Sequence, residues 1–351
     1  MYSERKIAVV LSGGGAKGAY QVGVIRRLFS RVPRIDVLCG SSVGALHAAV
    51  LAEAFLSDDA SILDRLERTW LNLYGVLTLD VRGLLRPLAA QSIFLNTRVR
   101  QLIHQCIPAG RSFSDYDVDL SVTAVNLNTG TASAFDRSSG APVREALLAS
   151  CAIPVVFPAV RIGRDYFVDG GTFNNTPLRE AMVRGATDVI VVSMRPRFSP
   201  VHQQGISTYP GTRRPDGQLD VGLAGAAEQG PGPHVSSRRF DSALSAGARL
   251  FELALERLLY EDMRMALRVN ELLRAVERVR AKDPDLAERM EKAAGLVKPG
   301  RTMRVVNVVE IAPQNELMPP GTLGFSDKRA IRNLIELGRA DADAVIGGFL
   351  R

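Results

Sequence analysis

Two apolar runs near the start of the chain, each stopped by a glycine-containing turn, constrain the fold more than any other feature. The first is K-I-A-V-V-L at residues 6–11, and the second is I-D-V-L-C at residues 35–39. Short apolar runs bounded by glycine indicate buried strands, and a helix-like stretch follows each turn. Strands that alternate with helices in this order predict an α/β fold with a parallel sheet.

The rest of the chain extends this pattern. Residues 60–106 are expected to be mostly helical. Further strands are expected at residues 118–125, 131–135, 166–168, 188–192 and 304–311. Helices are expected at residues 142–150 and, with Ser326 as the cap, at 326–339.

The second half changes character twice. Between residues 195 and 239, Gly, Pro, Ser, Gln and Arg dominate, which favours a flexible insertion or a mobile lid. Apolar residues then step by three and four and predict one stripe on a long helix. The stripe comprises Phe251, Leu255, Leu258, Met265, Val269, Leu272, Val276 and Val279.

We therefore divide the chain into three parts. They are a core at residues 6–195, a flexible insertion or lid at 196–240, and a C-terminal helical extension at 241–351. We expect the last strand and helix of the extension to complete the same domain as the core.

Composition limits the partners and the compartment. The formal net charge is +7, and a basic surface can attract nucleic acid or an anionic membrane. No nucleic-acid-binding signature accompanies the charge, so we expect no nucleic-acid partner. We recognise neither a membrane-spanning apolar run nor a signal peptide. These features predict a cytoplasmic protein, with peripheral contact with an anionic membrane surface left open and no oligomeric state predicted.

The three cysteines, Cys39, Cys106 and Cys151, are an odd number without metal-like spacing. They argue against a disulfide framework and against a zinc site.

The strongest chemical motif is G-S-S-V-G at residues 40–44, between a predicted strand and a predicted helix. A sharp strand-to-helix turn projects a serine hydroxyl clear of the sheet, and glycines two residues before and after relieve the crowding. This context predicts Ser42 as a nucleophile, with Gly40 and Gly44 forming the elbow. A plain turn is the alternative, and Ser41 has the wrong spacing.

The second motif is G-G-G-A-K-G at residues 13–18. A dinucleotide site would want an acidic residue at the carboxyl end of the second strand, where this chain has Cys39 and Gly40. A P-loop would want Ser or Thr after Lys17, which Gly18 follows instead. The motif favours an oxyanion hole, with a structural turn as the alternative.

In an oxyanion hole, backbone N–H groups converge on the oxygen of a tetrahedral intermediate. The sequence suggests the N–H groups of Gly14, Gly15 and Ala16 for this task. The helix N-terminus that follows, and Lys17, would add positive potential.

The prediction of the residue that acts as general base rests partly on the small number of histidines. Of the four histidines, His47 lies on the nucleophile's own helix but off its side, and His104 lies in an unmarked helix. His202 and His234 fall in the predicted insertion. A flexible segment would not hold a base rigidly within hydrogen-bond reach of the serine. This shortage favours Asp169, of D-G-G at residues 169–171, as a base acting directly on Ser42. A partly apolar pocket that raises its proton affinity would help it.

Taken together, these motifs closely resemble the patatin-like phospholipase family over residues 6–195. The similar segments are L-S-G-G-G-A-K-G at 11–18, G-S-S-V-G at 40–44, A-S-C-A-I-P at 149–154, F-P at 157–158, D-G-G at 169–171 and N-N-T-P at 174–177. Lys17 stands where arginine is frequent in the family.

The resemblance implies a three-layer α/β/α sandwich with a mostly parallel central sheet, and hydrolysis of lipid acyl esters. It implies Ser42 and Asp169 as a catalytic dyad that needs neither metal nor cofactor. It also implies an acyl-enzyme intermediate. The implied oxyanion hole is formed within Gly13, Gly14, Gly15, Ala16, Lys17 and Gly18.

Several functions stay open on this basis. Phospholipase A, lysophospholipase and neutral-lipid activities all fit the resemblance. A nonlipid esterase or thioesterase on the same fold is one alternative, and a catalytically silent membrane-associated protein is another. A dinucleotide-binding oxidoreductase is the third, and the absence of the ribose-binding acidic residue weighs against it.

Overall fold

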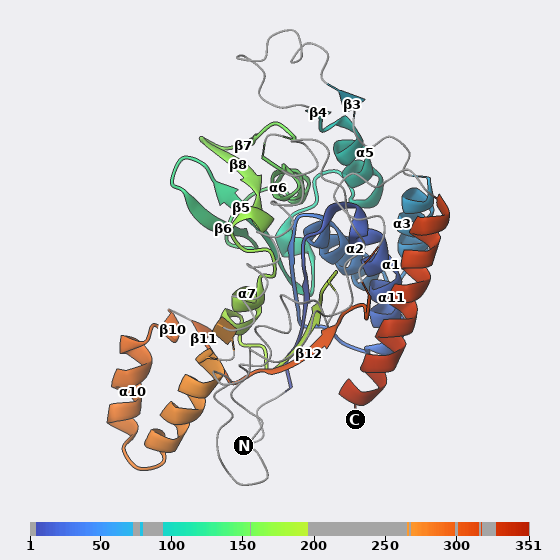
Figure 1. The fold of residues 1–351 in the computed structure, drawn as a ribbon. Helices are drawn as coiled ribbons and strands as arrows, with labels where there is room; N and C mark the ends of the chain where they lie inside the picture. The colour runs from blue at the N-terminus through green and yellow to red at the C-terminus, as the bar shows by residue number, and fades with distance from the viewer. Residues whose placement is uncertain are drawn as a thin grey trace, which may run out of the picture.

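The computed structural model describes residues 5–72, 78–79, 94–154, 156–195, 265–266, 268–298, 301–315, 317 and 328–350. Figure 1 shows their arrangement, with a central sheet between helices.

The central sheet has eight strands in the described part of the chain. Their order is β12-β9-β1-β2-β5-β8-β7, and β6 also pairs with β5. The strands from β12 to β5 in this order are parallel, whereas β6, β7 and β8 pair antiparallel. The strands are β1 (Ile7–Leu11), β2 (Val37–Ser41), β5 (Asp119–Asn126), β6 (Thr131–Phe135), β7 (Val160–Ile162), β8 (Asp165–Asp169), β9 (Asp188–Val192) and β12 (Asn307–Ile311).

Two helical layers cover the two faces of this sheet. Along β1, Val9 and Leu11 pack into one core, whereas Ala8 and Val10 pack into the other. The first core includes α1 (Gly18–Arg31), α2 (Val43–Ser57), α3 (Ser61–Leu71), α5 (Thr97–Cys106), α6 (Val143–Ser150) and α11 (Lys328–Phe349). The second includes α7 (Leu178–Val183) and Ala266. This arrangement confirms the three-layer α/β/α sandwich with a mostly parallel sheet.

The smaller elements lie around this sandwich. They are the 3-10 turns η1 (Gly15–Lys17), η2 (Phe113–Asp115) and η3 (Gly170–Thr172), the helix α10 (Pro284–Ala293), and the strand pairs β3 (Thr78–Leu79) with β4 (Phe94–Leu95) and β10 (Val297–Lys298) with β11 (Arg301–Thr302).

The C-terminal residues contribute to the same layers as the N-terminal ones. Strand β12 pairs with β9, and α11 packs along α1 (Figure 1). Two glycines allow this close packing, because a Cβ on Gly23 would lie 1.9 Å from the Ile335 carbonyl and one on Gly338 would lie 2.0 Å from the Tyr20 carbonyl. The three-part domain division of the chain stays a prediction.

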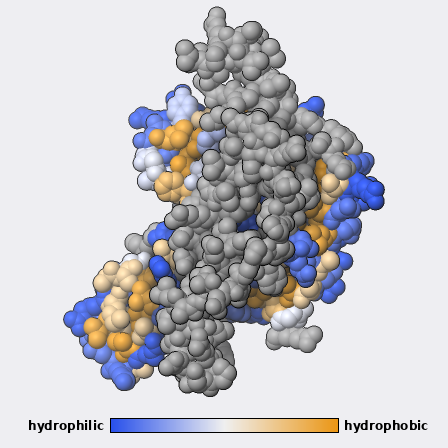
Figure 2. Space-filling model, viewed as in Figure 1, coloured by the Kyte–Doolittle hydropathy of each residue, from blue (hydrophilic) through white to orange (hydrophobic). Residues whose placement is uncertain are grey.

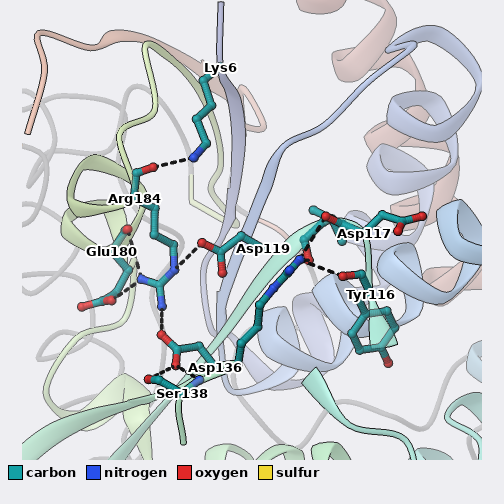
Figure 3. Close-up of polar contacts among 10 residues, drawn as sticks. Lys6, Tyr116, Asp117, Asp119, Asp136, Ser138, Glu180 and Arg184 are labelled. Carbon is teal, nitrogen blue, oxygen red and sulfur yellow. Dashed lines mark hydrogen bonds and ion pairs between the residues drawn. The ribbon is translucent and has the colours of Figure 1, made fainter. Parts of the chain in front are cut away.

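At the amino ends of the strands, a buried arginine holds three carboxylates. Figure 3 shows the Arg184 guanidinium between Glu180, Asp119 and Asp136. The ion-pair distances are 2.5 Å to Glu180, 3.4 Å to Asp119 and 2.5 Å to Asp136, and the Arg184 side chain is only 1% exposed. Lys6 adds a hydrogen bond of 2.7 Å from its Nζ to the Arg184 carbonyl. This network joins α7 to the two ends of the β5–β6 hairpin.

Several sequence expectations need correction. The strand β7 was not expected, and β3 and β4 interrupt the largely helical stretch 60–106. Helix α11 ends at Phe349 rather than at residue 339, because Gly338 packs against α1 and continues the helix instead of ending it. Strand β12 begins three residues later than expected.

The predicted apolar stripe is only partly correct. Residues 268–280 are helical and Val276 is fully buried. However, Met265 and Leu272 are 54% and 37% exposed, and Leu273 is buried in their place. The stripe residues Phe251, Leu255 and Leu258 lie outside the described residues, as do Ser326 and the whole predicted insertion at 196–240. None of the helices described is both long and apolar enough to cross a membrane.

Candidate active site

Ser42 lies at a sharp turn between β2 and α2, as the G-S-S-V-G motif predicts. Its backbone has φ 55° and ψ −130°, a conformation that residues other than glycine rarely adopt. The flanking glycines are sterically required, since a Cβ on Gly40 would lie 2.4 Å from the Gly44 carbonyl oxygen. A Cβ on Gly44 would lie 2.3 Å from the carbonyl oxygen of Leu11. Strain of this kind persists only where the surrounding structure holds it, which is common at functional sites.

Asp169 is brought to Ser42 by the antiparallel end of the sheet. It ends β8, opposite Ala124 of β5, while the neighbouring Thr123 lies opposite Ser41 at the end of β2. Ser42 Oγ donates a hydrogen bond of 2.6 Å to Asp169 Oδ2. Both residues are buried, at 7% and 3% exposure. The structure therefore brings together the two residues expected to act as nucleophile and base.

The environment of Asp169 favours proton uptake. Burial raises the pKa of its carboxyl to about 7, and this effect outweighs the lowering by hydrogen bonds from Ser42 and from the Gly171 N–H. The Gly171 bond measures 2.7 Å to Oδ1 and leaves Oδ2 facing Ser42. No cation lies within ion-pair distance of Asp169 among the residues that the structure describes. A carboxyl of this kind can accept and return a proton near neutral pH.

Ser150 supports the elbow and was not expected from the sequence. Its Oγ accepts a hydrogen bond of 2.9 Å from the Ser42 N–H and donates one of 2.7 Å to the Thr123 carbonyl. Ser150 ends α6 and is fully buried. It therefore ties the strained backbone of Ser42 to β5. The segment A-S-C-A-I-P at 149–154 contains this serine, but no local pattern indicates its role.

The glycine loop at residues 13–18 passes beside Ser42. A Cβ on Gly13 would lie 3.1 Å from Ser42 Cβ and 2.5 Å from Asn175 Oδ1. The Gly13 N–H donates to the Asn175 carbonyl at 3.1 Å, and the Lys17 N–H donates to the Gly14 carbonyl at 3.2 Å. These two N–H groups are engaged within the fold. The expected donors Gly14, Gly15 and Ala16 therefore stay the candidates for the oxyanion hole.

The loop conformation depends on its glycines. Gly15 has φ 55°, in the left-handed region that favours glycine. A Cβ on Gly14 would lie 2.5 Å from the terminal methyl carbon of Met194, and one on Gly18 would lie 2.7 Å from Cγ2 of Val43. Gly18 begins α1, so the loop leads directly into a helix N-terminus.

Neither of the two described histidines contacts Ser42 or Asp169. His104 is exposed on α5. His47 is fully buried within α2, where its ring nitrogens contact Gln21 and Trp70. His202 and His234 lie outside the described residues. The structure thus brings an aspartate, and neither of the described histidines, to Ser42.

Comparison with known proteins places this architecture in a family. The fold and the site define a three-layer α/β protein with a buried Ser-Asp pair at the carboxyl edge of its sheet. Residues 9–182 match the family model of the patatin-like phospholipases. Through this region, which includes both Ser42 and Asp169, the chain belongs to the patatin-like phospholipase family.

Several relatives with curated descriptions are similar over part of this chain. An uncharacterized NTE family protein of Mycobacterium tuberculosis is 30% identical over 254 residues, which cover 71% of this chain and 40% of the relative. The human patatin-like phospholipase domain-containing protein 6 is 29% identical over 192 residues, covering 54% of this chain and 13% of the relative. A cGAMP-activated phospholipase of Pseudomonas aeruginosa is 28% identical over 182 residues, covering 48% and 53%. The chain therefore spans well under two thirds of each relative.

Proposed function

We propose that this protein is a lipid acyl hydrolase that cleaves carboxylic esters with Ser42 as nucleophile and Asp169 as base. The observation that carries the proposal is the hydrogen bond of 2.6 Å from Ser42 Oγ to a buried carboxylate whose pKa is raised to about 7. Membership of a phospholipase family supports the class of reaction.

In the first half of the reaction, Ser42 Oγ attacks the ester carbonyl carbon and its proton passes to Asp169 Oδ2. The carbonyl oxygen becomes an oxyanion, for which the N–H groups of Gly14, Gly15 and Ala16 are the proposed donors. The intermediate then expels the alcohol, which takes the proton from Asp169. The acyl group stays on Ser42 as an ester.

In the second half, water attacks the acyl-enzyme and gives its proton to Asp169. Collapse of the second tetrahedral intermediate breaks the bond to Ser42 Oγ, which regains the proton from Asp169. The fatty acid is released and the enzyme is restored. A single carboxyl with a pKa near 7 suits this cycle, because it must be basic in one step and acidic in the next.

The surface near the site supports a lipid substrate. Figure 2 shows hydrophobic residues at the surface over the region of β5 to β8. Leu127, Tyr166 and Phe173 are exposed by 54%, 46% and 56%, and the Leu127 N–H donates to the Tyr166 carbonyl, so these two lie together. Phe173 follows Asp169 by four residues. Tyr166 and Phe173 lie within four residues of Asp169 along the chain, and exposed apolar side chains of this kind favour a substrate presented by a lipid surface.

The test of the proposal is fatty-acid release from vesicles of mixed phosphatidylcholine and phosphatidylglycerol. We expect release by the wild type and a loss of at least about 1000-fold in Ser42→Ala and in Asp169→Asn. Ser41→Ala is the matched control, because Ser41 is buried one residue away and its Oγ makes no hydrogen bond to any residue that the structure describes. Release by Asp169→Asn near the wild-type rate would rule out the dyad.

Parallel assays separate the alternatives. Hydrolysis of p-nitrophenyl butyrate without fatty-acid release from vesicles would indicate a nonlipid esterase or thioesterase. Vesicle binding without hydrolysis of either substrate would indicate a catalytically silent membrane-associated protein. For a lipid hydrolase, Phe173→Ser should lower the rate on vesicles and leave the rate on p-nitrophenyl butyrate within about twofold.

A further inference from the structure

A chain of buried hydrogen bonds connects the first helical layer to the glycine loop. Trp70 Nε1 donates to His47 Nε2 at 3.1 Å, and His47 Nδ1 lies 2.9 Å from Gln21 Oε1. Gln21 Nε2 in turn donates to the Ser12 carbonyl at 2.9 Å. All four residues are at most 2% exposed. We call this chain of Trp70, His47, Gln21 and the Ser12 carbonyl the buried relay.

The direction of every bond in the buried relay is fixed. An indole N–H can only donate, so His47 Nε2 must accept and His47 Nδ1 must carry the proton that is donated to Gln21 Oε1. Burial lowers the pKa of His47 to about 3, which keeps the ring neutral and preserves this tautomer. The Gln21 amide then has its nitrogen directed at Ser12.

The last bond of the buried relay falls on the first peptide unit of the glycine loop. The peptide between Ser12 and Gly13 is planar, with its oxygen and its N–H on opposite sides. Its oxygen accepts from Gln21, and its N–H donates to the Asn175 carbonyl at 3.1 Å. The orientation of this plane is therefore fixed at both ends. The next peptide units carry the N–H groups of Gly14 and Gly15.

Outside support matters here because glycines do not fix their own backbone. Three consecutive glycines have the widest choice of backbone conformation, and η1 spans only three residues. Preorganised donors stabilise an oxyanion only if they already face it. The buried relay and Asn175 supply the constraint that the loop sequence lacks.

We propose that Gln21 and His47 are positioning residues that hold the Ser12–Gly13 peptide and thereby orient the oxyanion-binding N–H groups of the glycine loop. The inference rests on the proposed function, since it concerns the same reaction at Ser42. Neither side chain bonds to Ser42 or Asp169 in the structure. They act on the developing oxyanion through the loop.

The test compares kcat and KM for p-nitrophenyl butyrate in Gln21→Met with those of the wild type. Met keeps the volume of Gln but leaves the Ser12 carbonyl and the His47 Nδ1–H unpaired. Because a small misplacement of catalytic groups costs on the order of 100-fold, we expect kcat to fall by about 30- to 100-fold. We expect KM to stay within about twofold, since the loop would act on the transition state. The rate of Ser42 labelling by a fluorophosphonate should fall in parallel.

A matched control separates positioning from general loss of a buried hydrogen bond. Asn270 is 3% exposed and makes two bonds to the Val306 backbone, at 2.8 and 2.9 Å, away from the loop. Asn270→Leu should lower the melting temperature about as much as Gln21→Met while keeping kcat within about twofold. An equal fall of kcat in both variants would mean that the buried relay has no specific role.

A second pair of variants keeps the test decisive if Gln21→Met does not fold. His47→Gln can still accept from Trp70 and donate to Gln21, whereas His47→Leu can do neither. We expect the Gln variant to retain at least about a third of the wild-type kcat and the Leu variant to fall at least tenfold below it. Equal kcat values in the two would overturn the proposal. If Ser42→Ala kept full activity, the proposed function itself would fail, whatever the relay variants show.

Discussion

The two ends of the central sheet both bury aspartate, but they surround it differently. At the amino end, Asp136 is 6% exposed and pairs with Arg184 at 2.5 Å. At the carboxyl end, Asp169 is 3% exposed and receives hydrogen bonds from Ser42 and the Gly171 N–H, with no ion pair to a described residue. A neighbouring cation stabilises the ionised form of a carboxylate, whereas burial without one favours the protonated form.

This difference distinguishes a carboxylate that stabilises the fold from one that can take up a proton near neutral pH. The Arg184 network ties three segments together, and its one guanidinium is shared by three carboxylates. Burial raises the pKa of the Asp169 carboxyl to about 7. The same burial lowers the stability of the folded state at pH values where the carboxyl would be ionised in the unfolded chain. Burial alone therefore does not distinguish the two aspartates. The absence of a neighbouring cation among the described residues, and the hydrogen bond from the strained Ser42, set Asp169 apart.

The largest effect on stability is expected at the amino end. Arg184→Met should lower the free energy of unfolding by about 3–5 kcal/mol, because it leaves the buried Asp136 carboxylate, and two partly buried ones, without their cation. The rate at which the folded protein hydrolyses p-nitrophenyl butyrate should change little. Urea denaturation measures the first quantity, and p-nitrophenyl butyrate hydrolysis measures the second.

A matched arginine gives the control for that variant. Arg34 pairs with Asp36 at 2.6 Å but its side chain is 69% exposed. Arg34→Met should therefore cost no more than about 1 kcal/mol. Equal losses in the two variants would show that the Arg184 network is not specially stabilising.

At the carboxyl end, we expect a substitution to raise the stability of the folded state instead of lowering it. The folded-state pKa of Asp169 is about 7, above the ordinary value of about 3.9. Between these values the folded state binds more protons than the unfolded state, so the group's contribution to stability falls as pH rises. Asp169→Asn lacks this loss and should gain stability relative to the wild type by on the order of 3 kcal/mol between pH 4 and pH 8. Urea denaturation of both proteins at the two pH values tests this, and a constant difference would contradict the raised pKa.

A smaller loss is expected at the support of the elbow. Ser150→Ala leaves the Ser42 N–H and the Thr123 carbonyl without their partner, which should cost about 1–3 kcal/mol. Because Ser42 has a strained backbone, kcat should fall as well, by about tenfold, while KM changes little. Ser121→Ala is the control, since Ser121 is buried on the same strand as Thr123 and its Oγ has no hydrogen-bond partner within the described part of the chain. A Ser150→Ala protein as active as this control would remove Ser150 from the account.

The sequence pointed to Ser42 and Asp169 for two different reasons. Ser42 was recognisable because the strand-turn-helix geometry is encoded within five residues, 40–44. Asp169 was inferred because no histidine was expected in a rigid element beside Ser42, and because of the family resemblance. Its distance to Ser42 depends on strand pairing between segments 127 residues apart, which no local pattern encodes.

The buried relay could not be predicted for the same physical reason. His47 was expected to be packed in the core, and it is, but its partners come from α1 and α3. Hydrogen-bond partners on three different helices depend on how those helices pack. Apolar periodicity predicts only which face of each helix is buried. The extension of α11 past Gly338 has a similar origin, because the contact of that glycine with α1 decides its role.

The pH dependence of Ser42 labelling by a fluorophosphonate tests the central claim most directly. The account predicts that the second-order rate constant of the wild type rises with pH to a plateau, with a midpoint near the Asp169 pKa of about 7. In Asp169→Asn the labelling should be at least about 100-fold slower and should lose this midpoint. Labelling of Asp169→Asn at the wild-type rate, with the midpoint near 7 retained, would contradict the assignment of Asp169 as the base.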